Sequence, residues 1–148
     1  KMNDFSQRNL TALRRREFGY IFQFFNLIDF LNVEENILLP SIFDKNTTCK
    51  NSIDNILNYF GIYNRRSSYP NELSGGEKQR VAIARAISYN PSVIFADEPT
   101  GNLDKKAAEE IINIIFSCKK KYNQTLLIVT HDTSLYKHFT QIIELRKK

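Results

Sequence analysis

The pattern of apolar and polar residues predicts strands separated by helices. Phe18–Phe22, which is aromatic and β-branched, is typical of a strand. Val93–Ala96 and Leu126–Val129 are continuous apolar runs, which indicate short strands buried on both faces of a sheet. The polar segment Lys1–Glu17 is expected to contain a short helix with a basic end. We expect a short helix and a strand at Gln141–Leu145 to close the chain.

Apolar residues at helical spacing predict the helices. One pattern starts at Val33, and we expect Pro40 to end that helix because proline lacks a backbone N–H. A second pattern starts at Ile53, and we expect Gly61 to end the helix that it predicts. Longer helices are expected from Ser74 to about Tyr89 and from Lys105 to about Tyr122. The first two patterns rest on Val33, Ile37, Leu38, Ile53, Ile56, Leu57 and Phe60.

Buried strands that alternate with helices predict an α/β fold, with a parallel sheet covered on both faces. The block at about 27–89 is helical and separates the sheet strands, so it is expected to be an inserted subdomain. The sequence contains no internal repeat and no low-complexity tract.

The composition is that of an ordinary globular domain. The 148 residues are 42% hydrophobic and 25% charged, which argues against a disordered or fibrous protein. The formal charge of +5 bears on solubility rather than on fold. Cys49 and Cys118 lie far apart without a CxxC pair, which argues against a disulfide scaffold or a zinc site, so we expect unpaired thiols. No apolar run is long enough to span a bilayer.

The segment LSGGEKQR, Leu73–Arg80, combines a helix start with two glycines. Ser74 can cap the helix, and Glu77 three residues later completes a capping box. Gly75 and Gly76 have no side chains, so a ligand can approach the exposed N–H groups of the first turn, where the helix dipole favours phosphate. The alternative is an ordinary capped helix.

Two acids, Asp97 and Glu98, end the apolar strand at Val93–Ala96. Ligands of parallel α/β sheets bind at the carboxyl ends of strands. One carboxylate there can hold Mg²⁺ through water, while its neighbour polarises an attacking water. Two solvated acids are the alternative, but the turn that follows is expected to return a third carboxylate, Asp104, toward the same edge.

Two further polar residues end the other predicted strands. His131 follows Leu126–Val129 and can hydrogen-bond a terminal phosphate. Gln23 follows Phe18–Phe22 and can contact a metal or an attacking water. By itself, a histidine at the end of a strand is more often structural, and Gln23 is also compatible with an ordinary polar strand end.

Together, these features resemble the ATP-binding cassette (ABC) ATPases over nearly the whole chain. The matching motifs, in the family's order, are the Q-loop at Gln23, the signature motif Leu73–Arg80, Walker B at Val93–Pro99, the D-loop Gly101–Asp104 and the H-loop at His131. The resemblance implies a P-loop NTPase-type parallel sheet, incomplete at the N-terminus, with an inserted α-helical subdomain. Residues 1–26 and 90–148 would form the RecA-like sheet part, and 27–89 the subdomain that carries the signature motif.

Three segments resemble one branch of the family, which serves macrolide export, lipoprotein release and antimicrobial-peptide resistance. They are Phe22–Leu27, Val33–Ile37 and Ala96–Asp104. In that branch the ATPase drives a membrane permease, so the resemblance implies ATP and Mg²⁺ as cofactors and a location at the cytoplasmic face of the cell membrane. The implied partners are a second ATPase subunit in a homodimer and an integral-membrane permease, whereas no nucleic acid is expected.

The resemblance also implies roles for individual residues on the nucleotide. Asp97 would hold Mg²⁺ through water, and Glu98 would be the general base for the attacking water. His131 would hold the γ-phosphate of ATP. Gln23 would contact the metal and link its site to the permease.

Other residues would act across the subunit interface or on the permease. Ser74, Gly75, Gly76 and Glu77 would contact the ATP bound to the opposite subunit, and Asp104 would bridge the two subunits. The permease would dock near Phe24–Ile37 and on the helical subdomain. Phe24 and Phe25 are equally compatible with a place in the core.

The sequence contains no GxxxxGK[ST] phosphate-binding loop. Its glycines are Gly19, Gly61, Gly75, Gly76 and Gly101, and none begins that motif. The family places this loop upstream of the Q-loop, so we expect the chain to be a fragment that does not hydrolyse ATP alone.

Two other functions compete with a transport ATPase. One is a soluble ABC-type ATPase of translation or DNA repair, although repair members carry a long coiled coil where this chain has only Phe24–Glu72. The other is a non-catalytic interaction module that has kept the signature helix.

Overall fold

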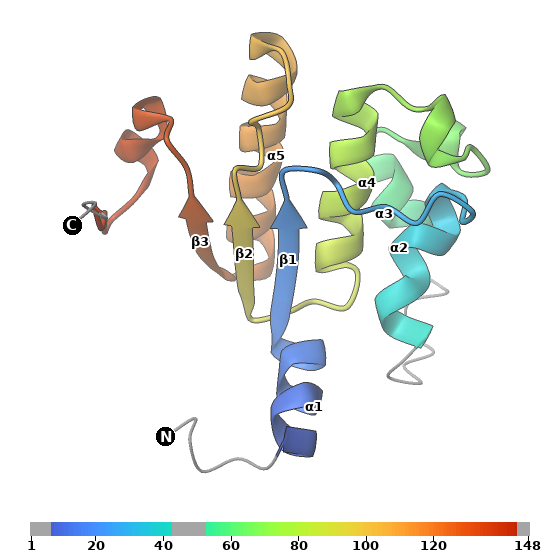
Figure 1. Cartoon of the computed structure of the whole chain (residues 1–148), viewed down its shortest axis with the longest axis horizontal. Helices are drawn as coiled ribbons and strands as arrows, with labels where there is room; N and C mark the ends of the chain where they lie inside the picture. The colour runs from blue at the N-terminus through green and yellow to red at the C-terminus, as the bar shows by residue number, and fades with distance from the viewer. Residues whose placement is uncertain (1–6, 43–52, 145–148) are drawn as a thin grey trace.

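The computed structural model describes residues 7–42 and 53–144 (Figure 1). Most predicted elements are present, and the strand at Phe18–Phe22 and the helix at Lys105–Tyr122 have the predicted bounds. The helices and strands are α1 (Gln7–Glu17), β1 (Phe18–Phe22), α2 (Val33–Ile42), α3 (Ile53–Tyr59), α4 (Gly75–Ile87), β2 (Val93–Asp97), α5 (Lys105–Tyr122) and β3 (Thr125–Val129), with short 3₁₀ helices η3 (Tyr63–Arg65), η4 (Pro70–Glu72) and η5 (Thr133–His138).

The strands form a parallel sheet in the order β1-β2-β3. Phe22 pairs with Asp97, and Asp97 pairs with Val129, so the three strands end level with one another. Figure 1 shows their arrowheads side by side at one edge. The residues that follow the strands are therefore brought together, which is where ligands of parallel sheets bind.

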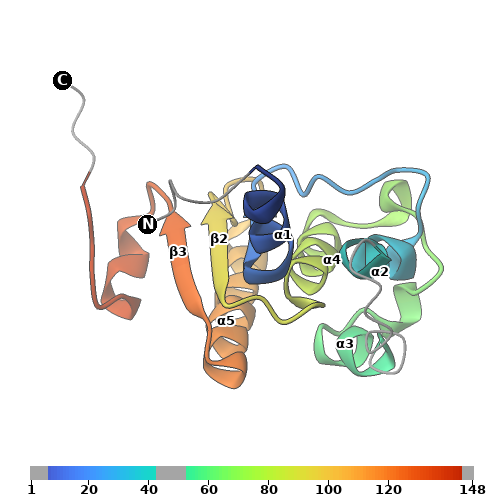
Figure 2. The same cartoon turned by 90° about the horizontal axis from the view of Figure 1, so that it is seen from below.

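Helices α4 and α5 cover one face of the sheet. Figure 2 shows α5 on one side of the strands, and α4 packs against β1 and α5. Ile21 and Ile94 point into this layer and are 1% exposed. They join the buried core formed with Val81, Ile83, Ile111 and Ile115. Burial of these aliphatic side chains is the main stabilising contribution of the layer.

The opposite face differs from the prediction of a sheet covered on both sides. Tyr20, Leu127 and Val129 point to this face and are 41%, 48% and 51% exposed. Tyr20 stacks on Phe95, with ring centroids 5.4 Å apart, so the rings cover one another in part. Within the described strands, successive residues therefore alternate between the covered face and the exposed face of the sheet. The continuous apolar runs in the sequence do not reveal this difference.

The predicted end of the second helix was wrong. Helix α2 continues through Pro40 to Ile42. Proline removes one backbone hydrogen bond and its ring crowds the carbonyl four residues earlier, but Pro40 lies in the last turn, so this disturbance is confined to the end of the helix. The hydroxyl of Ser41 donates to the carbonyl of Leu38 at 2.6 Å and so supports this turn. The predicted stop at Gly61 is confirmed, because Gly61 has a φ of +65°.

The predicted strand at Gln141–Leu145 was also wrong over residues 141–144, which have no regular structure. Leu145 lies outside the described residues. Ile142 and Ile143 are 47% and 75% exposed. A strand needs a neighbour for its backbone hydrogen bonds, and the described sheet ends at β3.

Cys118 is a buried free thiol, as predicted, and Cys49 lies outside the described residues. Burial raises the pKa of the Cys118 thiol to about 11. None of the helices in the described ranges is both long and apolar enough to cross a membrane.

Candidate functional site

The start of α4 has the predicted capping box. The Ser74 hydroxyl accepts a hydrogen bond from the N–H of Glu77 at 3.3 Å, and Glu77 Oε2 accepts the N–H of Ser74 at 2.8 Å. This backbone hydrogen bond, followed by the ion pair of Glu77 with Arg65 at 2.8 Å, lowers the pKa of the Glu77 carboxyl. Ser74 is the cap itself, so the helix begins one residue later than predicted, at Gly75.

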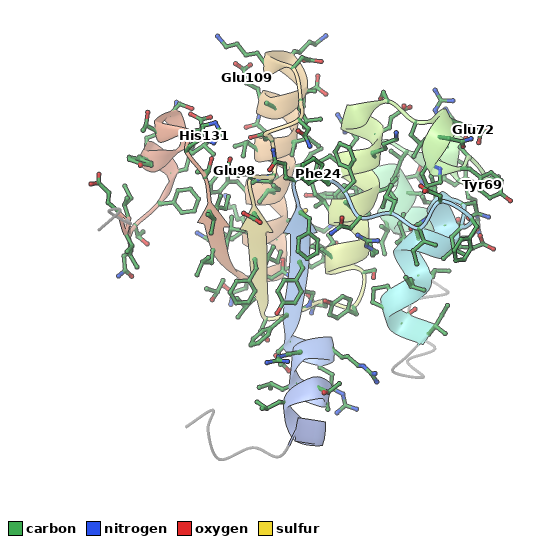
Figure 3. All side chains as sticks on the ribbon, in the orientation of Figure 1. Phe24, Tyr69, Glu72, Glu98, Glu109 and His131 are labelled. Carbon is green, nitrogen blue, oxygen red and sulfur yellow. The ribbon has the colours of Figure 1, made fainter. Side chains whose placement is uncertain are left out.

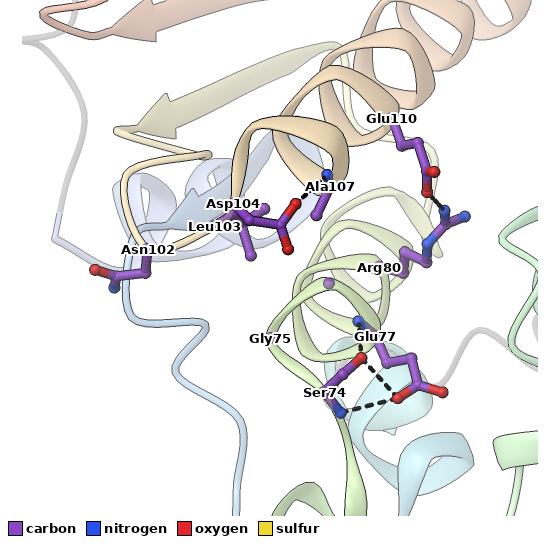
Figure 4. A pocket seen from close by; sticks show the side chains of 10 residues that line it. Ser74, Gly75, Glu77, Arg80, Asn102, Leu103, Asp104, Ala107 and Glu110 are labelled. Carbon is purple, nitrogen blue, oxygen red and sulfur yellow. Dashed lines mark hydrogen bonds and ion pairs between the residues drawn. The ribbon is translucent and has the colours of Figure 1, made fainter.

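The signature segment faces the start of α5 across an open pocket of about 520 Å³ (Figure 4). Ser74, Gly75 and Gly76 line one side, and Asn102 and Asp104 lie opposite. Asp104 caps α5, because its Oδ1 accepts the N–H of Ala107 at 2.9 Å. Two helix N-termini therefore border the same pocket, and their partial positive charges lie beside the carboxylates of Glu77, Asp104 and Glu110 and the guanidinium of Arg80.

The glycines of this pocket are not required by the fold. A Cβ on Gly76 would lie 3.6 Å from Cβ of Ala107, and a Cβ on Gly75 would lie 3.4 Å from Leu103 Cδ2. Both distances allow a methyl group, and alanine is favoured over glycine inside a helix by about 1 kcal/mol. Glycine here keeps the first-turn N–H groups open, which fits the approach of a phosphate.

Glu98 and His131 come together at the ends of β2 and β3 (Figure 3). Glu98 Oε1 accepts the backbone N–H of His131 at 2.9 Å and lies 2.8 Å from His131 Nδ1. Glu98 Oε2 accepts the hydroxyl of Thr130 at 3.2 Å. The Glu98 side chain is 21% exposed and that of His131 is 83% exposed. The carboxylate is thus held in one orientation, whereas the imidazole faces solvent.

The backbone of Glu98 adopts an uncommon conformation. Its φ is +42°, in the left-handed region, and its N–H donates to the carbonyl of Val129 at 2.9 Å. Non-glycine residues adopt this conformation only where the surrounding structure holds them, and such residues are enriched at functional sites. The hydrogen bond to β3 supplies that restraint.

Asp97 ends β2 beside Glu98 and is exposed. Within the described ranges, no group of three or more His, Cys, Asp or Glu side chains could together hold a metal ion. The turn after β2 brings Asp104 to the N-cap of α5, where it lines the pocket. A single carboxylate suits Mg²⁺, which keeps several waters, better than a metal that needs a protein cage.

Gln23 joins the turn after β2. Its carbonyl accepts the side-chain amide of Asn102 at 3.0 Å, and its Nε2 donates to Asn102 Oδ1 at 3.4 Å. A Cβ on Gly101 would lie 2.8 Å from Gln23 Nε2, so the side chain passes close over the turn. The structure thus connects Gln23 to the turn that leads to the pocket.

Sequence reasoning did not identify Gln79, Arg85 or Asn102 as contributors. Gln79 is fully buried, and its Nε2 donates to the carbonyl of Pro99 at 2.7 Å, which ties α4 to the turn after Glu98. Its place among the buried apolar residues of α4, at helical spacing from Ile83 and Ala86, is a signal that could have revealed it.

Comparison with known proteins agrees with this arrangement. The ABC transporter family model matches residues 1–101. The lipoprotein-releasing ATP-binding protein LolD of Cytophaga hutchinsonii is 45% identical over 90% of this chain and 61% of its own length. The bacitracin export ATP-binding protein BceA of Halalkalibacterium halodurans is 38% identical over 99% of this chain and 58% of its own length. The macrolide export protein MacB of Bradyrhizobium diazoefficiens is 40% identical over 93% of this chain.

Solved structures agree as well. The dimeric structure of a bacterial ABC transporter cassette superimposes with a TM-score of 0.78 at 38% identity, over 93% of this chain and 62% of that one. The chain thus spans about three fifths of the length of LolD, BceA and the solved cassette, and 21% of the length of MacB. The predicted α/β, P-loop NTPase-type fold and the predicted branch are confirmed. From its matched residues, its fold and its relatives, this chain belongs to the ABC transporter family.

Proposed function

We propose that this chain is the ATP-binding part of a transport ATPase, which couples ATP hydrolysis to export or release of a peptide, drug or lipoprotein through a membrane permease. The observation that carries the proposal is the Glu98 carboxylate, held beside His131 at the carboxyl edge of the sheet. The names of the relatives, which are ATP-binding proteins of lipoprotein release and bacitracin export, support it.

Glu98 is suited to act as the general base for the attacking water. The hydrogen bonds from Thr130 and from the His131 backbone fix its carboxylate, so one oxygen lone pair can be aimed at a water proton. A positioned base contributes about 10²–10⁴-fold to the rate. Mg²⁺, held through water by Asp97 and reached by Gln23, would neutralise charge on the phosphates when bound.

His131 is suited to hold the terminal phosphate. An ionised Glu98 can only accept hydrogen bonds, so the imidazole donates to it from Nδ1. The ring is 83% exposed, so Nε2 is accessible. In the neutral ring Nε2 is an acceptor, and it donates to a phosphate oxygen when the ring is protonated.

The signature pocket would act on the nucleotide of a second subunit. Ser74, Gly75 and Gly76 would offer the phosphate their N–H groups and a hydroxyl, Glu77 would hold this segment in shape, and Asp104 would lie at the subunit contact. The dimeric form of the related cassette structure supports this proposal.

The permease would contact the segment after Gln23. Phe24 and Phe30 are 73% and 80% exposed, and Phe25 is only half-buried, so this segment presents aromatic side chains to an apolar partner. Residues 27–89 would form the helical subdomain that shares the docking surface, and 1–26 and 90–148 the sheet part. This arrangement would place the chain at the cytoplasmic face of the membrane.

Co-purification with the permease encoded beside this chain tests the proposal. The affinity-tagged chain is expected to retain that permease, identified by mass spectrometry, and Phe24→Asp is expected to reduce the retained amount at least tenfold. Lys137→Asp, a change at an exposed residue of η5, is the control and leaves retention unchanged. Failure of the wild-type chain to retain the permease would favour the soluble ATPase or the interaction module. Equal retention by the wild-type chain and Phe24→Asp would show that Phe24 does not contribute to the docking surface.

A further inference from the structure

The loop after β1 contains two consecutive residues in a left-handed conformation. Phe25 has a φ of +63° and Asn26 a φ of +49°. Asparagine tolerates this region, but for phenylalanine it is a strained conformation. Such a pair persists only where other parts of the structure hold it.

Arg85, on α4, holds both residues. Its Nη1 donates to the carbonyl of Asn26 at 2.7 Å, and its Nη2 donates to the carbonyl of Phe25 at 2.9 Å. The guanidinium is half-buried, and burial lowers its pKa. Hydrogen bonds from a charged donor are stronger than those between neutral groups, and the rigid fork of arginine can bind two acceptors at once.

Arg85 lies 59 and 60 residues after Asn26 and Phe25 in the sequence, and its contacts differ from those of the other α4 arginine. Arg80 pairs with the Glu110 carboxylate at 2.7 Å and donates to one backbone carbonyl, whereas Arg85 donates to two adjacent backbone carbonyls of one loop. A cation in this place that serves two adjacent carbonyls is suited to restrain the backbone.

The restraint bears directly on Phe24. Phe24 precedes the two left-handed residues, and its side chain is 73% exposed (Figure 3). On one side Gln23 is tied to Asn102, and on the other the Phe25 ring reaches toward Gly75, with Cζ 4.0 Å from the position of a Cβ there. The loop is therefore held at both ends while Phe24 remains accessible.

We propose that Arg85 is a positioning residue, which fixes residues 24–26 to α4 and thereby presents Phe24 at a set place relative to the signature segment. Any displacement of α4 would then carry Phe24 with it. The link to a permease rests on the proposed function, but the restraint itself does not.

Amide hydrogen exchange of the full chain, followed by NMR, tests the restraint. The N–H of Phe25 donates to the carbonyl of Phe22, and that of Asn26 to the carbonyl of Phe24, so both amides report on the loop. Arg85→Met is expected to speed their exchange at least tenfold. Exchange at Ile94, in β2, is expected to stay unchanged, which shows that the core is intact.

Arg80→Met is the matched control. It removes the same charge from the same helix, and Arg80 also donates to a backbone carbonyl, that of Phe60, at 3.1 Å. It is expected to leave exchange at Phe25 and Asn26 unchanged. An equal effect of both arginine variants on these amides would overturn the proposal, because it would show a general loosening of α4.

Arg85→Lys keeps the charge, but its single ammonium nitrogen replaces the two guanidinium nitrogens that bind the two carbonyls. This variant tests the restraint if Arg85→Met does not fold. Partial acceleration of exchange at Phe25 and Asn26 supports the restraint, and wild-type exchange overturns it. A second readout uses the absence of tryptophan from the sequence. In a Phe24→Trp background, Arg85→Lys is expected to lower the fluorescence anisotropy of the single tryptophan, and unchanged anisotropy would contradict the proposal.

The two proposals fail separately. If the loop loosens in the Arg85 variants but the permease is not retained by the wild-type chain, the restraint stands and the transport function falls. If the permease is retained and the loop exchanges at the wild-type rate in the Arg85 variants, the transport function stands and Arg85 has no positioning role.

Discussion

Two polar clusters at the carboxyl edge of the sheet are built in different ways. The signature pocket presents backbone N–H groups and glycines where two capped helices begin. The Glu98 cluster consists of side chains fixed by hydrogen bonds between β2 and β3. The signature pocket depends on open space, so added bulk is expected to disable it. The Glu98 cluster depends on one charged group, so loss of that charge is expected to disable the cluster.

The largest expected effect is the loss of the Glu98 charge. In a transporter whose ATPase subunit joins this sequence to the upstream GxxxxGK[ST] region of a related cassette, Glu98→Gln is expected to lower ATP turnover by about 10²–10⁴-fold, because the amide cannot accept a proton from water. Phosphate release measures the effect, and nucleotide binding is expected to remain. Glu109→Gln, on the exposed surface of α5, is the control. Turnover at the wild-type rate in Glu98→Gln would contradict the role of the base.

Added bulk in the pocket is expected to have opposite effects on stability and turnover. Gly76→Ala fits beside Ala107 and should raise the free energy of unfolding by about 0.5–1 kcal/mol. The methyl group should nevertheless lower turnover about tenfold or more, because it hinders approach to the N–H groups. Urea unfolding and phosphate release measure the two effects.

Asn113→Ala serves as the control for the glycine variant. It lies on the exposed side of α5 and improves helix propensity without approaching the pocket. It should stabilise the chain and leave turnover unchanged. If Gly76→Ala behaves in the same way, open space at the signature segment has no function.

A smaller effect is expected from pH. The pKa of Glu77 is lowered in the folded chain, first by the hydrogen bond from the Ser74 N–H, so its contribution to stability is present above the unfolded pKa. That contribution is lost as the pH falls through the lowered folded pKa. Glu77→Gln should therefore flatten the loss of stability as the pH falls below about 4.3, the ordinary pKa of a glutamate, and urea unfolding measures this. A profile as steep as that of Glu109→Gln would show that the carboxylate has no such role.

Local patterns predicted most of the fold. The apolar runs around Ile94 and Ile128 were correctly predicted as strands, although Leu127 and Val129 are exposed in the second, and the predicted helix from Lys105 has its observed bounds. Pro40 misled the prediction because proline is harmful inside a helix but tolerated in its last turn. The prediction of a strand after Gln141 failed for another reason. A strand forms only beside a neighbouring strand, and local sequence does not reveal that neighbour.

The candidate site was predicted in its parts but not in its connections. The sequence indicated that Glu98 and His131 end neighbouring strands, and the structure brings them to 2.8 Å. It could not indicate that Asp104 would cap α5 at the pocket, because that depends on the path of the turn. The Arg85 contacts join residues about 60 positions apart, and no local pattern reports such pairs.

The rate of Mg²⁺-dependent phosphate release tests the central claim most directly. Without a GxxxxGK[ST] loop in its 148 residues, the isolated chain is expected to release no phosphate above background. A transporter whose ATPase subunit joins this sequence to the upstream GxxxxGK[ST] region of a related cassette is expected to turn over ATP and to lose that turnover in Glu98→Gln. Turnover by the isolated chain, or turnover in the transporter that does not depend on Glu98, would contradict the account.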